Sequence, residues 1–278
     1  MSATVLPGPG RRRPTEEFPV PQRAAILFFR HVARVTIGIF SEIGKRVHFL
    51  REIGRATMEV GTWLPLTARQ MRNIGVDSLP LAGIVAAFIG AVTAYQTVYQ
   101  LFPGVQLSAV GWIVRQSVVL ELGPLLTALV LAGRVGARMT AEIGTMRVTE
   151  QIDALETLAY DPIGYLVVPR VIAAIIMLPV LTIVADSVGV ATAFATSIVA
   201  TDVLRSDFIE GLRLAFAPFQ IVYSLIKATI FGLAIGFFCS YEGYTADVGA
   251  EGVGRSTAQA VVITSVAILV LDALTALL

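Results

Sequence analysis

WIVRQSVVLELGPLLTALVLAG, residues 112–133, is long and apolar enough to cross a lipid bilayer, as are FQIVYSLIKATIFGLAIGFF (219–238) and VVITSVAILVLDALTALL (261–278). Each stretch also holds one charged residue, namely Glu121, Lys227 or Asp272. An isolated charge at the centre of a bilayer costs at least about 2.5 to 3.5 kcal/mol, so such groups face a protein interior and mark a functional site. The sequence therefore predicts an all-α integral membrane protein with an internal polar site.

Composition supports the membrane class. Of 278 residues, 55% are hydrophobic and 15% charged, whereas soluble domains carry about 25% charged residues. Twelve of the 21 Lys and Arg residues precede position 80, which indicates an N-terminal part held against an anionic cytoplasmic leaflet and argues against a nucleic-acid binder. One cysteine, Cys239, excludes an intrachain disulfide, and with only His31 and His48 beside it no metal site is expected.

Five spans are predicted from the rule of about 20 apolar residues per crossing. They cover residues 79–102, 111–136, 166–200, 218–241 and 256–278. The third is longer than a bilayer requires and contains Pro169 and Pro179, so we expect it to be kinked, tilted or to begin in the interface. These spans form the permease domain predicted for residues 76–278.

The residues before the first span divide into two parts. Residues 1–22 have the composition of a disordered basic tail, and residues 23–75 are predicted to form interfacial or cytoplasmic helices. On a helix, Arg23, Arg30 and Arg34 fall within about 40° of one another, opposite an apolar face. This pattern predicts an N-terminal interfacial helix with these arginines as its anchor. The alternative is a soluble amphipathic helix packed on the rest of the protein.

Basic residues also predict the orientation. They gather in the N-terminal region and in the predicted loop 137–165, and the other side has little beyond Arg205 and Arg213. The N-terminus is therefore predicted to be cytoplasmic and the C-terminus to lie outside.

Helix geometry then places the three intramembrane charges in the outer half of the bilayer at similar depth. Glu121, Lys227 and Asp272 are accordingly predicted to share one network if their spans are neighbours. The alternative is three unrelated charges that snorkel or bond to local backbone, and for Arg115 we expect snorkelling. A shared network would either lock the helices together or line a cavity for a polar headgroup.

AEIGTMRVTEQIDALETLAYDP, residues 141–162, contains a short amphipathic acidic helix between the second and third spans. Ile152, Leu155 and either Leu158 or Ala159 fall on one side. A cytoplasmic helix of this kind suits docking to a partner protein, although many such helices are simply solvated. The candidate docking residues are Glu150, Gln151, Asp153, Glu156 and Asp161.

The run ELGPLLTALVLAGRVGARMTAEIGTMRVTEQIDALETLAYDP, residues 121–162, resembles the signature of the MlaE (YrbE) permease family. LTARQMRNIGVDSLPLAGIVAAFIGAVTAYQ (66–96) precedes it in the matching place, and IKATIFG (226–232), EGY (242–244) and SVAILVLDALTALL (265–278) are similar to the family as well. The resemblance covers residues 66–278. Members carry Arg immediately before the Glu of ELGP, where this chain has Leu120. Either Arg115 partly substitutes, or the headgroup preference differs.

The resemblance implies the permease subunit of an MCE-type ABC lipid transporter. Such a subunit is a homodimer bound to two ABC ATPase subunits and to an MCE-domain protein on the outer face. It moves phospholipid or related lipid between the bacterial inner membrane and the outer envelope, which maintains lipid asymmetry. The acidic helix would then be the coupling helix seated in the ATPase. Glu121, Lys227 and Asp272 would line the lipid path, with Gln96 and Arg115 as further polar candidates there.

Enzymatic activity is not expected in this chain. A phosphate-binding P-loop needs Lys between Gly and Ser or Thr, whereas the chain has only Lys45, in GKR, and Lys227. ATP and Mg²⁺ would be bound by the partner ATPase, and no cofactor is predicted here. Two other classes stay open: a proton-coupled secondary transporter that relays protons through Glu121 and Asp272, and a non-transporting membrane scaffold. Only the ATPase-coupled class accounts for the acidic loop helix.

Overall fold

The computed structural model describes residues 20–102 and 104–277, with side chains from Ile37 onward except Ile39. The described residues form helices joined by short turns, and no strand occurs among them. The chain divides after His48 into two units, which are described separately. Apart from its last three residues, the basic tail predicted at 1–22 lies outside the described residues.

Helix α1 runs from Val20 to Ala56 and makes up the described part of the first unit. The side chains of Arg23, Arg30 and Arg34 lie outside the described residues, so their anchoring role stays a prediction. Farther along α1, Ile37 and Phe40 are exposed, and Lys45 donates a hydrogen bond of 2.7 Å to Glu42. This bond holds the pKa of Glu42 below its usual value.

The second unit, from Phe49 onward, contains the five candidate membrane spans, in agreement with the predicted number and fold class. Short 3₁₀ or π turns, labelled η, interrupt several of them. The elements after α1 are α2 (Val60–Ile74), η1 (Val76–Ser78), α3 (Leu79–Gln100), α4 (Ser108–Ser117), η2 (Val118–Leu122), α5 (Gly123–Leu131), η3 (Ala132–Gly136), α6 (Ala137–Val148), α7 (Gln151–Thr157), η4 (Ile163–Val167), α8 (Val168–Ala200), α9 (Arg205–Arg213), α10 (Phe219–Tyr244) and α11 (Ala250–Thr275).

Two helical segments extend past the predicted ends of their spans. The second candidate span continues to Val148, so the loop that we expected to begin at residue 137 begins twelve residues later, at residue 149. Before the first span, α2 leads through η1 directly into α3. Both differences have one cause: hydropathy marks where a helix leaves the hydrocarbon, whereas charged residues such as Arg138 and Glu142 continue the helix beyond it.

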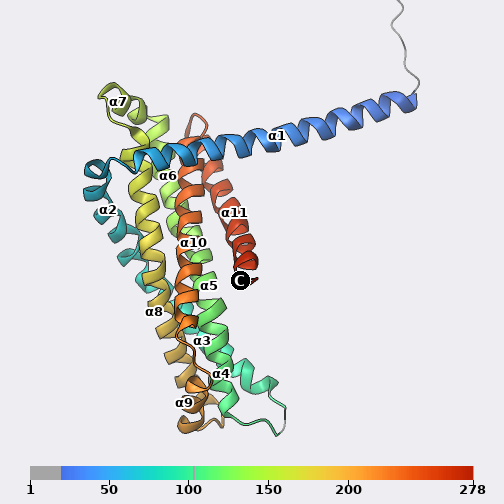
Figure 1. Ribbon diagram of the computed structural model, residues 1–278, viewed down its shortest axis with the longest axis vertical. Coiled ribbons are helices and arrows are strands. Elements are labelled where there is room, and N and C mark those ends of the chain that lie inside the picture. Colours follow the sequence, from blue (N-terminus) through green and yellow to red (C-terminus); the bar gives the residue numbers. More distant parts are fainter. Residues whose placement is uncertain (1–19, 103, 278) are drawn as a thin grey trace, which may run out of the picture. The chain divides into compact units, whose positions relative to one another are not determined.

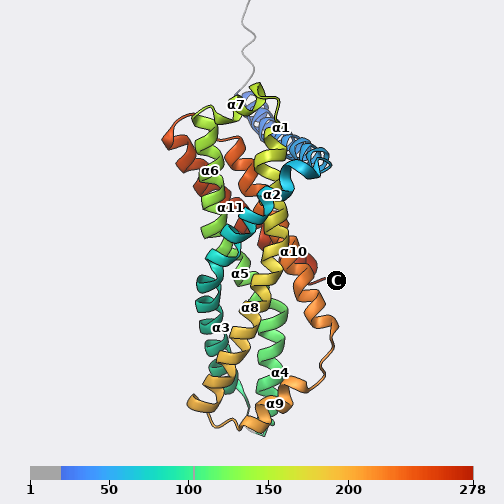
Figure 2. The same cartoon turned by 90° about the vertical axis from the view of Figure 1, so that its left-hand side faces the viewer.

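Helix α8 is central to the second unit and packs against α3 and α10 (Figures 1 and 2). The α3 face against it carries small buried residues at every fourth position: Ala82, Ala86, Gly90 and Ala94. On α8 the buried residues Ala185, Gly189, Ala193 and Ser197 repeat the same spacing. In lipid, helices associate through close packing of such small residues.

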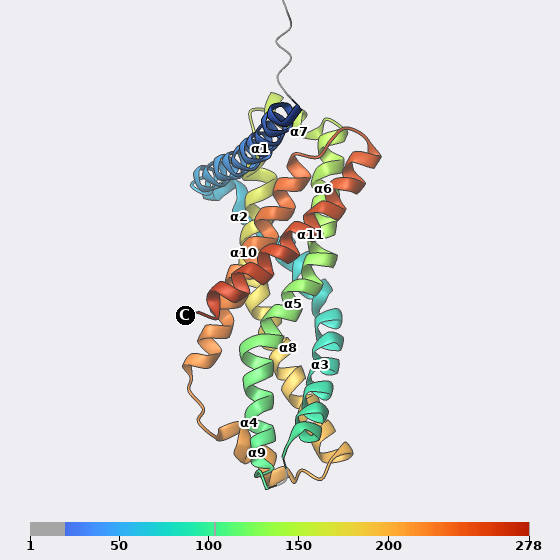
Figure 3. The same cartoon turned by 90° about the vertical axis from the view of Figure 1, so that its right-hand side faces the viewer.

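Figure 3 shows α11 running obliquely across α5 and α10, which brings its C-terminal half to α10.

The closest approach of α3 to α8 occurs at Gly90, where a Cβ would lie 1.9 Å from the Gly189 carbonyl oxygen. We expect Gly90→Ala to lower the melting temperature of the detergent-purified protein by several degrees, because neither backbone can yield without separating the helices. Gly83→Ala on the same helix is the matched control, since a Cβ there meets nothing within 4 Å. Equal melting temperatures for the two variants would contradict this packing.

Candidate functional site

Lys227 on α10 lies between the carboxylates of Glu121, in η2, and Asp272, on α11. Its Nζ is 2.7 Å from Glu121 Oε2 and 2.6 Å from Asp272 Oδ1. The lysine side chain is fully buried, whereas that of Glu121 is 43% exposed and that of Asp272 13% exposed. The structure thus brings the three sequence-predicted charges together, and it joins three separate spans through one ammonium group.

The turn that holds Glu121 follows from Pro124. Proline has no N–H, so the Leu120 carbonyl, four residues earlier, loses its normal helical donor. The chain forms a π turn instead, in which the Gly123 N–H bonds to the Val118 carbonyl. The Leu120 carbonyl then accepts a hydrogen bond of 3.4 Å from Lys227 Nζ. The ELGP sequence therefore supplies two acceptors for Lys227, one from the Glu121 side chain and one from the backbone.

An ammonium group has three donors, and those of Lys227 face Glu121, Asp272 and the Leu120 carbonyl. The ring of Tyr223 lies 5.7 Å from Nζ, and its hydroxyl donates a 2.8 Å hydrogen bond to the Thr275 carbonyl, which ties α10 to the end of α11. The cation is thus enclosed. What this site presents to its surroundings is the partly exposed Glu121 carboxylate.

Asp186 on α8 is a further ionisable residue inside an apolar span, which the sequence reasoning missed. Its Oδ2 accepts a 3.4 Å hydrogen bond from Ser224, and its Oδ1 is buried with no hydrogen-bond partner among the described residues. A Cβ on Gly123 would lie 1.7 Å from Oδ1, which places Asp186 beside the turn that carries Glu121. A groove of about 280 Å³ borders Asp186, Ser187 and Ser224. The signal was the one used for Glu121, an acidic residue inside a long apolar stretch.

The acidic segment contains a shorter helix than predicted, α7, over Gln151–Thr157. Ile152 is buried as expected, and Asp153 pairs with Arg147 at 3.2 Å. Glu150 precedes the helix with a positive φ of 57°, and Ala159 has a φ of 60°, so the chain turns at both ends. Gln151, Asp153 and Glu156 lie on α7 and are exposed.

Two expectations for this segment were wrong. Neither alternative for the last position of the apolar side is buried: Leu158 is 68% exposed and Ala159 is exposed too, because the helix ends before both. Asp161 lies outside α7, and its carboxylate accepts hydrogen bonds from the Ile163 and Gly164 N–H groups at 3.1 and 3.2 Å. It therefore caps the helical segment that begins with η4, as an aspartate before a helix commonly does.

The permease MlaE family model matches residues 67–278. The chain belongs to the MlaE permease family. A probable ABC transporter permease protein of Rickettsia prowazekii is 43% identical over 208 residues, which cover 75% of this chain and 80% of the relative. The intermembrane phospholipid transport system permease protein MlaE of Haemophilus influenzae is 33% identical over 85% of this chain and 95% of its own. The chloroplastic protein TRIGALACTOSYLDIACYLGLYCEROL 1 of Arabidopsis thaliana is 36% identical over 74% of this chain and 59% of its own.

In this MlaE-family chain, Arg115 does not take the place of the arginine missing at Leu120. Its guanidinium is buried and donates to the carbonyls of Leu212 and Leu214 at 2.5 and 3.0 Å. The expectation that Arg115 snorkels was wrong, because the connection between α9 and α10 folds over it and supplies acceptors. Arg115 therefore fixes that connection to α4.

Gln96, the other polar candidate, is exposed on α3. It borders a groove of about 530 Å³ that Tyr95, Tyr99 and Thr196 also line. The groove is large enough for part of an acyl chain or a headgroup, but it does not contain any member of the charge network.

Pro124→Ala tests the origin of the site's geometry. An alanine N–H can bond to the Leu120 carbonyl, so we expect the π turn to revert to a regular helix, which rotates Glu121 away from Lys227. The protein should fold, because the change restores a helical hydrogen bond. If Glu121 acts in lipid transfer, the transfer rate should fall about as far in Pro124→Ala as in Glu121→Ala. Pro80→Ala, at the start of α3, is the control. Full function of Pro124→Ala would show that the turn does not position Glu121.

Proposed function

We propose that this chain is the permease subunit of an ATP-driven ABC transporter that moves phospholipid or a related lipid between the bacterial inner membrane and the outer envelope. Family membership supports this proposal, as do relatives named as ABC transporter permeases and as a phospholipid transport permease. Five apolar helices are consistent with a multi-pass membrane subunit. The N-terminus is cytoplasmic in this proposal.

The exposure of Glu121 is the observation on which the proposal chiefly rests. In a single copy of the chain, 43% of this side chain is uncovered within a candidate membrane span. A carboxylate facing lipid tails is strongly unfavourable, so the surface around it must be covered by protein or must line a polar cavity. A homodimer with the lipid path between its two copies satisfies both requirements. We place Glu121, Lys227 and Asp272 at that path.

Coupling to ATP is assigned to α7 and the turn after it. This segment exposes the acidic residues Asp153 and Glu156 together with the apolar side chains of Leu158 and Tyr160. Exposed apolar side chains with polar residues around them mark protein interaction sites. We propose that one ABC ATPase subunit, which binds ATP and Mg²⁺, docks here on each copy of the permease.

The MCE-domain protein would bind at the opposite end of the helices, where α4 and α9 lie (Figure 1).

Removing the shared cation tests the lipid path. Lys227→Ala leaves two buried or partly buried carboxylates without their counter-charge, whereas Asp272→Ala leaves one ion pair intact. Breaking a buried pair costs about 3–5 kcal/mol when one charge stays behind. We therefore expect ATP-dependent lipid transfer in reconstituted vesicles to fall further in Lys227→Ala than in Asp272→Ala.

The control for this test is Lys45→Ala, which changes the chain's other lysine on an exposed face of α1. If the yield of folded protein fell in these variants in proportion to the free energy of the broken ion pair, the network would only lock the helices together. Unchanged lipid occupancy and transfer in the Lys227, Glu121 and Asp272 variants would remove the network from the path. Transfer driven by a proton gradient without ATP would replace the proposal with secondary transport.

Charge reversal on α7 tests the coupling assignment. The variant Asp153→Lys/Glu156→Lys should release or uncouple the ATPase, because both side chains are exposed on the proposed docking surface, and membrane insertion should be unaffected. The measurement is co-purification of the ATPase together with ATP-driven transfer. Glu210→Lys, a single charge reversal at an exposed residue of α9, should leave co-purification of the ATPase unchanged. An intact, active complex in the α7 variant would overturn the assignment.

A further inference from the structure

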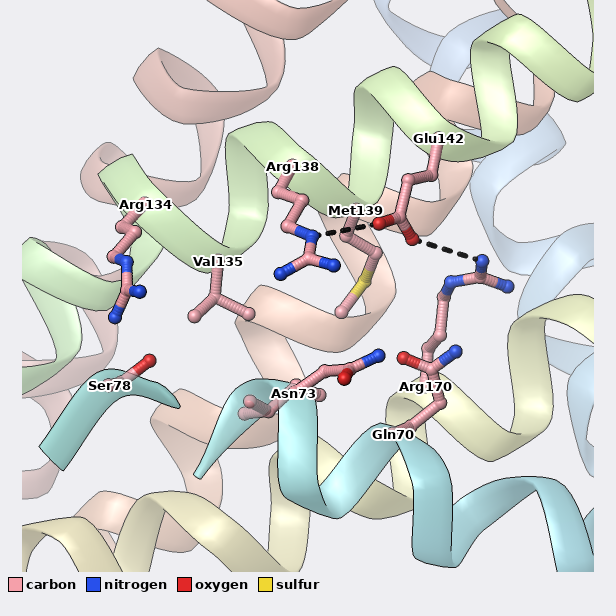
Figure 4. Close-up of a pocket in the computed structure, with 10 residues that line it drawn as sticks. Gln70, Asn73, Ser78, Arg134, Val135, Arg138, Met139, Glu142 and Arg170 are labelled. Atoms are coloured by element: carbon pink, nitrogen blue, oxygen red, sulfur yellow. Dashed lines mark hydrogen bonds and ion pairs between the residues drawn. The ribbon is translucent and has the colours of Figure 1, made fainter. Parts of the chain in front are cut away.

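A second polar site lies between α2, η1, η3, α6 and α8, far from Lys227. Figure 4 shows Arg134 and Arg138 extending from one side of this pocket, Ser78, Asn73 and Gln70 on the other, and Arg170 with Glu142 at one end. Glu142 bridges two of the arginines: Oε1 accepts from Arg138 Nε at 2.8 Å and Oε2 from Arg170 Nη2 at 3.4 Å. We call these residues the arginine pocket.

The arginine pocket holds more donors than acceptors. Arg134, Arg138 and Arg170 face two carboxylates, Glu142 and, at 3.9 Å from Arg138, Asp77. Both oxygens of Glu142 already accept a guanidinium hydrogen bond. Arg134 donates to the Asp77 backbone carbonyl, which uses only one of its several N–H groups. The pocket therefore has an excess of positive charge and of N–H donors.

Two buried polar atoms of the arginine pocket lack hydrogen-bond partners, so the unsatisfied groups extend to its interior. Ser78 Oγ and Arg170 Nε are buried and have no hydrogen-bond partner among the described residues. Both residues line the pocket, and the Arg170 side chain is only 6% exposed. A buried polar group without a partner costs about 1–3 kcal/mol, so native proteins rarely keep two in one pocket unless a ligand or water satisfies them.

Size and depth narrow the choice of ligand. The interior of about 30 Å³ holds two or three water-sized atoms, at roughly 10–15 Å³ each. The two non-bridging oxygens of a phosphodiester meet that limit, and they only accept hydrogen bonds. Arg134 lies about 20 Å from Glu121 along the same helical segment, toward the end that carries α7 (Figure 1). Glu121 itself lies about 15 Å from the predicted outer end of this span at residue 111. Arg134 therefore lies about 35 Å from that end, beyond a hydrocarbon core about 30 Å thick and at headgroup depth.

From these observations we infer that the arginine pocket binds the phosphate group of a membrane phospholipid, at the end of the bundle that carries α7. The guanidinium groups of Arg134 and Arg170 and the hydroxyl of Ser78 hold the two non-bridging oxygens, and the acyl chains remain in the surrounding bilayer. The inference does not depend on the proposed transport function. Free inorganic phosphate shares this chemistry and is distinguished in the experiment below.

Ser78→Ala is the sharpest variant. It removes a hydroxyl that has no hydrogen-bond partner among the described residues, so it should not lower the melting temperature, yet it should weaken phosphate binding roughly tenfold or more. Arg134→Gln removes an exposed cation from the pocket and should have an effect at least as large. Arg255→Gln on α11, the same change at an exposed arginine that pairs with Asp247, is the matched control.

The measurement uses the full-length protein in a phosphate-free neutral detergent. Native mass spectrometry counts retained dioleoylphosphatidylglycerol per copy of the chain during titration, with dioleoylglycerol as the phosphate-free comparison. We expect the wild type and Arg255→Gln to retain one more phosphatidylglycerol than Ser78→Ala and Arg134→Gln, and dioleoylglycerol to show no such difference. Displacement of the lipid by millimolar inorganic phosphate would support the phosphate chemistry and identify free phosphate as a competing source. Equal retention in all four proteins, or an equal difference for dioleoylglycerol, would overturn the inference.

Discussion

The fully buried ammonium of Lys227 constrains the rest of the permease domain. Placed within a membrane span, it requires acceptors on every side, and it obtains them from η2 and α11. Because the carboxylates come from different spans, the second, fourth and fifth spans must meet at this level. The small residues that let α3 and α8 approach each other add packing around this arrangement, but only the charge cluster fixes the relative heights of three helices.

Proline positions explain how straight apolar helices present polar groups at defined points. In lipid every backbone carbonyl needs a donor within the protein, and a proline removes one. At Pro124 the freed carbonyl is satisfied by Lys227, and the π turn that results carries Glu121. Pro169 has the same relation to η4, where the Val168 N–H bonds to the Ile163 carbonyl. For the third π turn, η3, no nearby proline supplies this explanation.

The class, the number of spans and the meeting of three charges could be predicted from sequence, because a charge in a lipid-length apolar stretch is a strong signal and its cost demands a partner. Other features depended on contacts that no local pattern contains. Arg115 looks exposed near a span end, but a connection about 100 residues later folds over it. Asp161 looked like part of an acidic helix, yet its position before Pro162 makes it a cap. The arginine pocket was missed because arginines at a span end are also what orientation alone requires.

The two polar sites differ in hydrogen-bonding character, and this difference bears on how the protein treats a lipid. At the Lys227 site the donors face protein acceptors, so the group offered to the surroundings is the Glu121 carboxylate, which attracts ammonium groups, hydroxyl groups and water and repels phosphate. At the arginine pocket both Glu142 oxygens already accept guanidinium hydrogen bonds and other donors remain, so phosphate is favoured. A zwitterionic headgroup carries both kinds of group, and no single orientation at either site satisfies both. To reach the level of Glu121, a lipid held by its phosphate near the α7 end must therefore give up that contact. Its ammonium or hydroxyl groups can then donate to the Glu121 carboxylate instead.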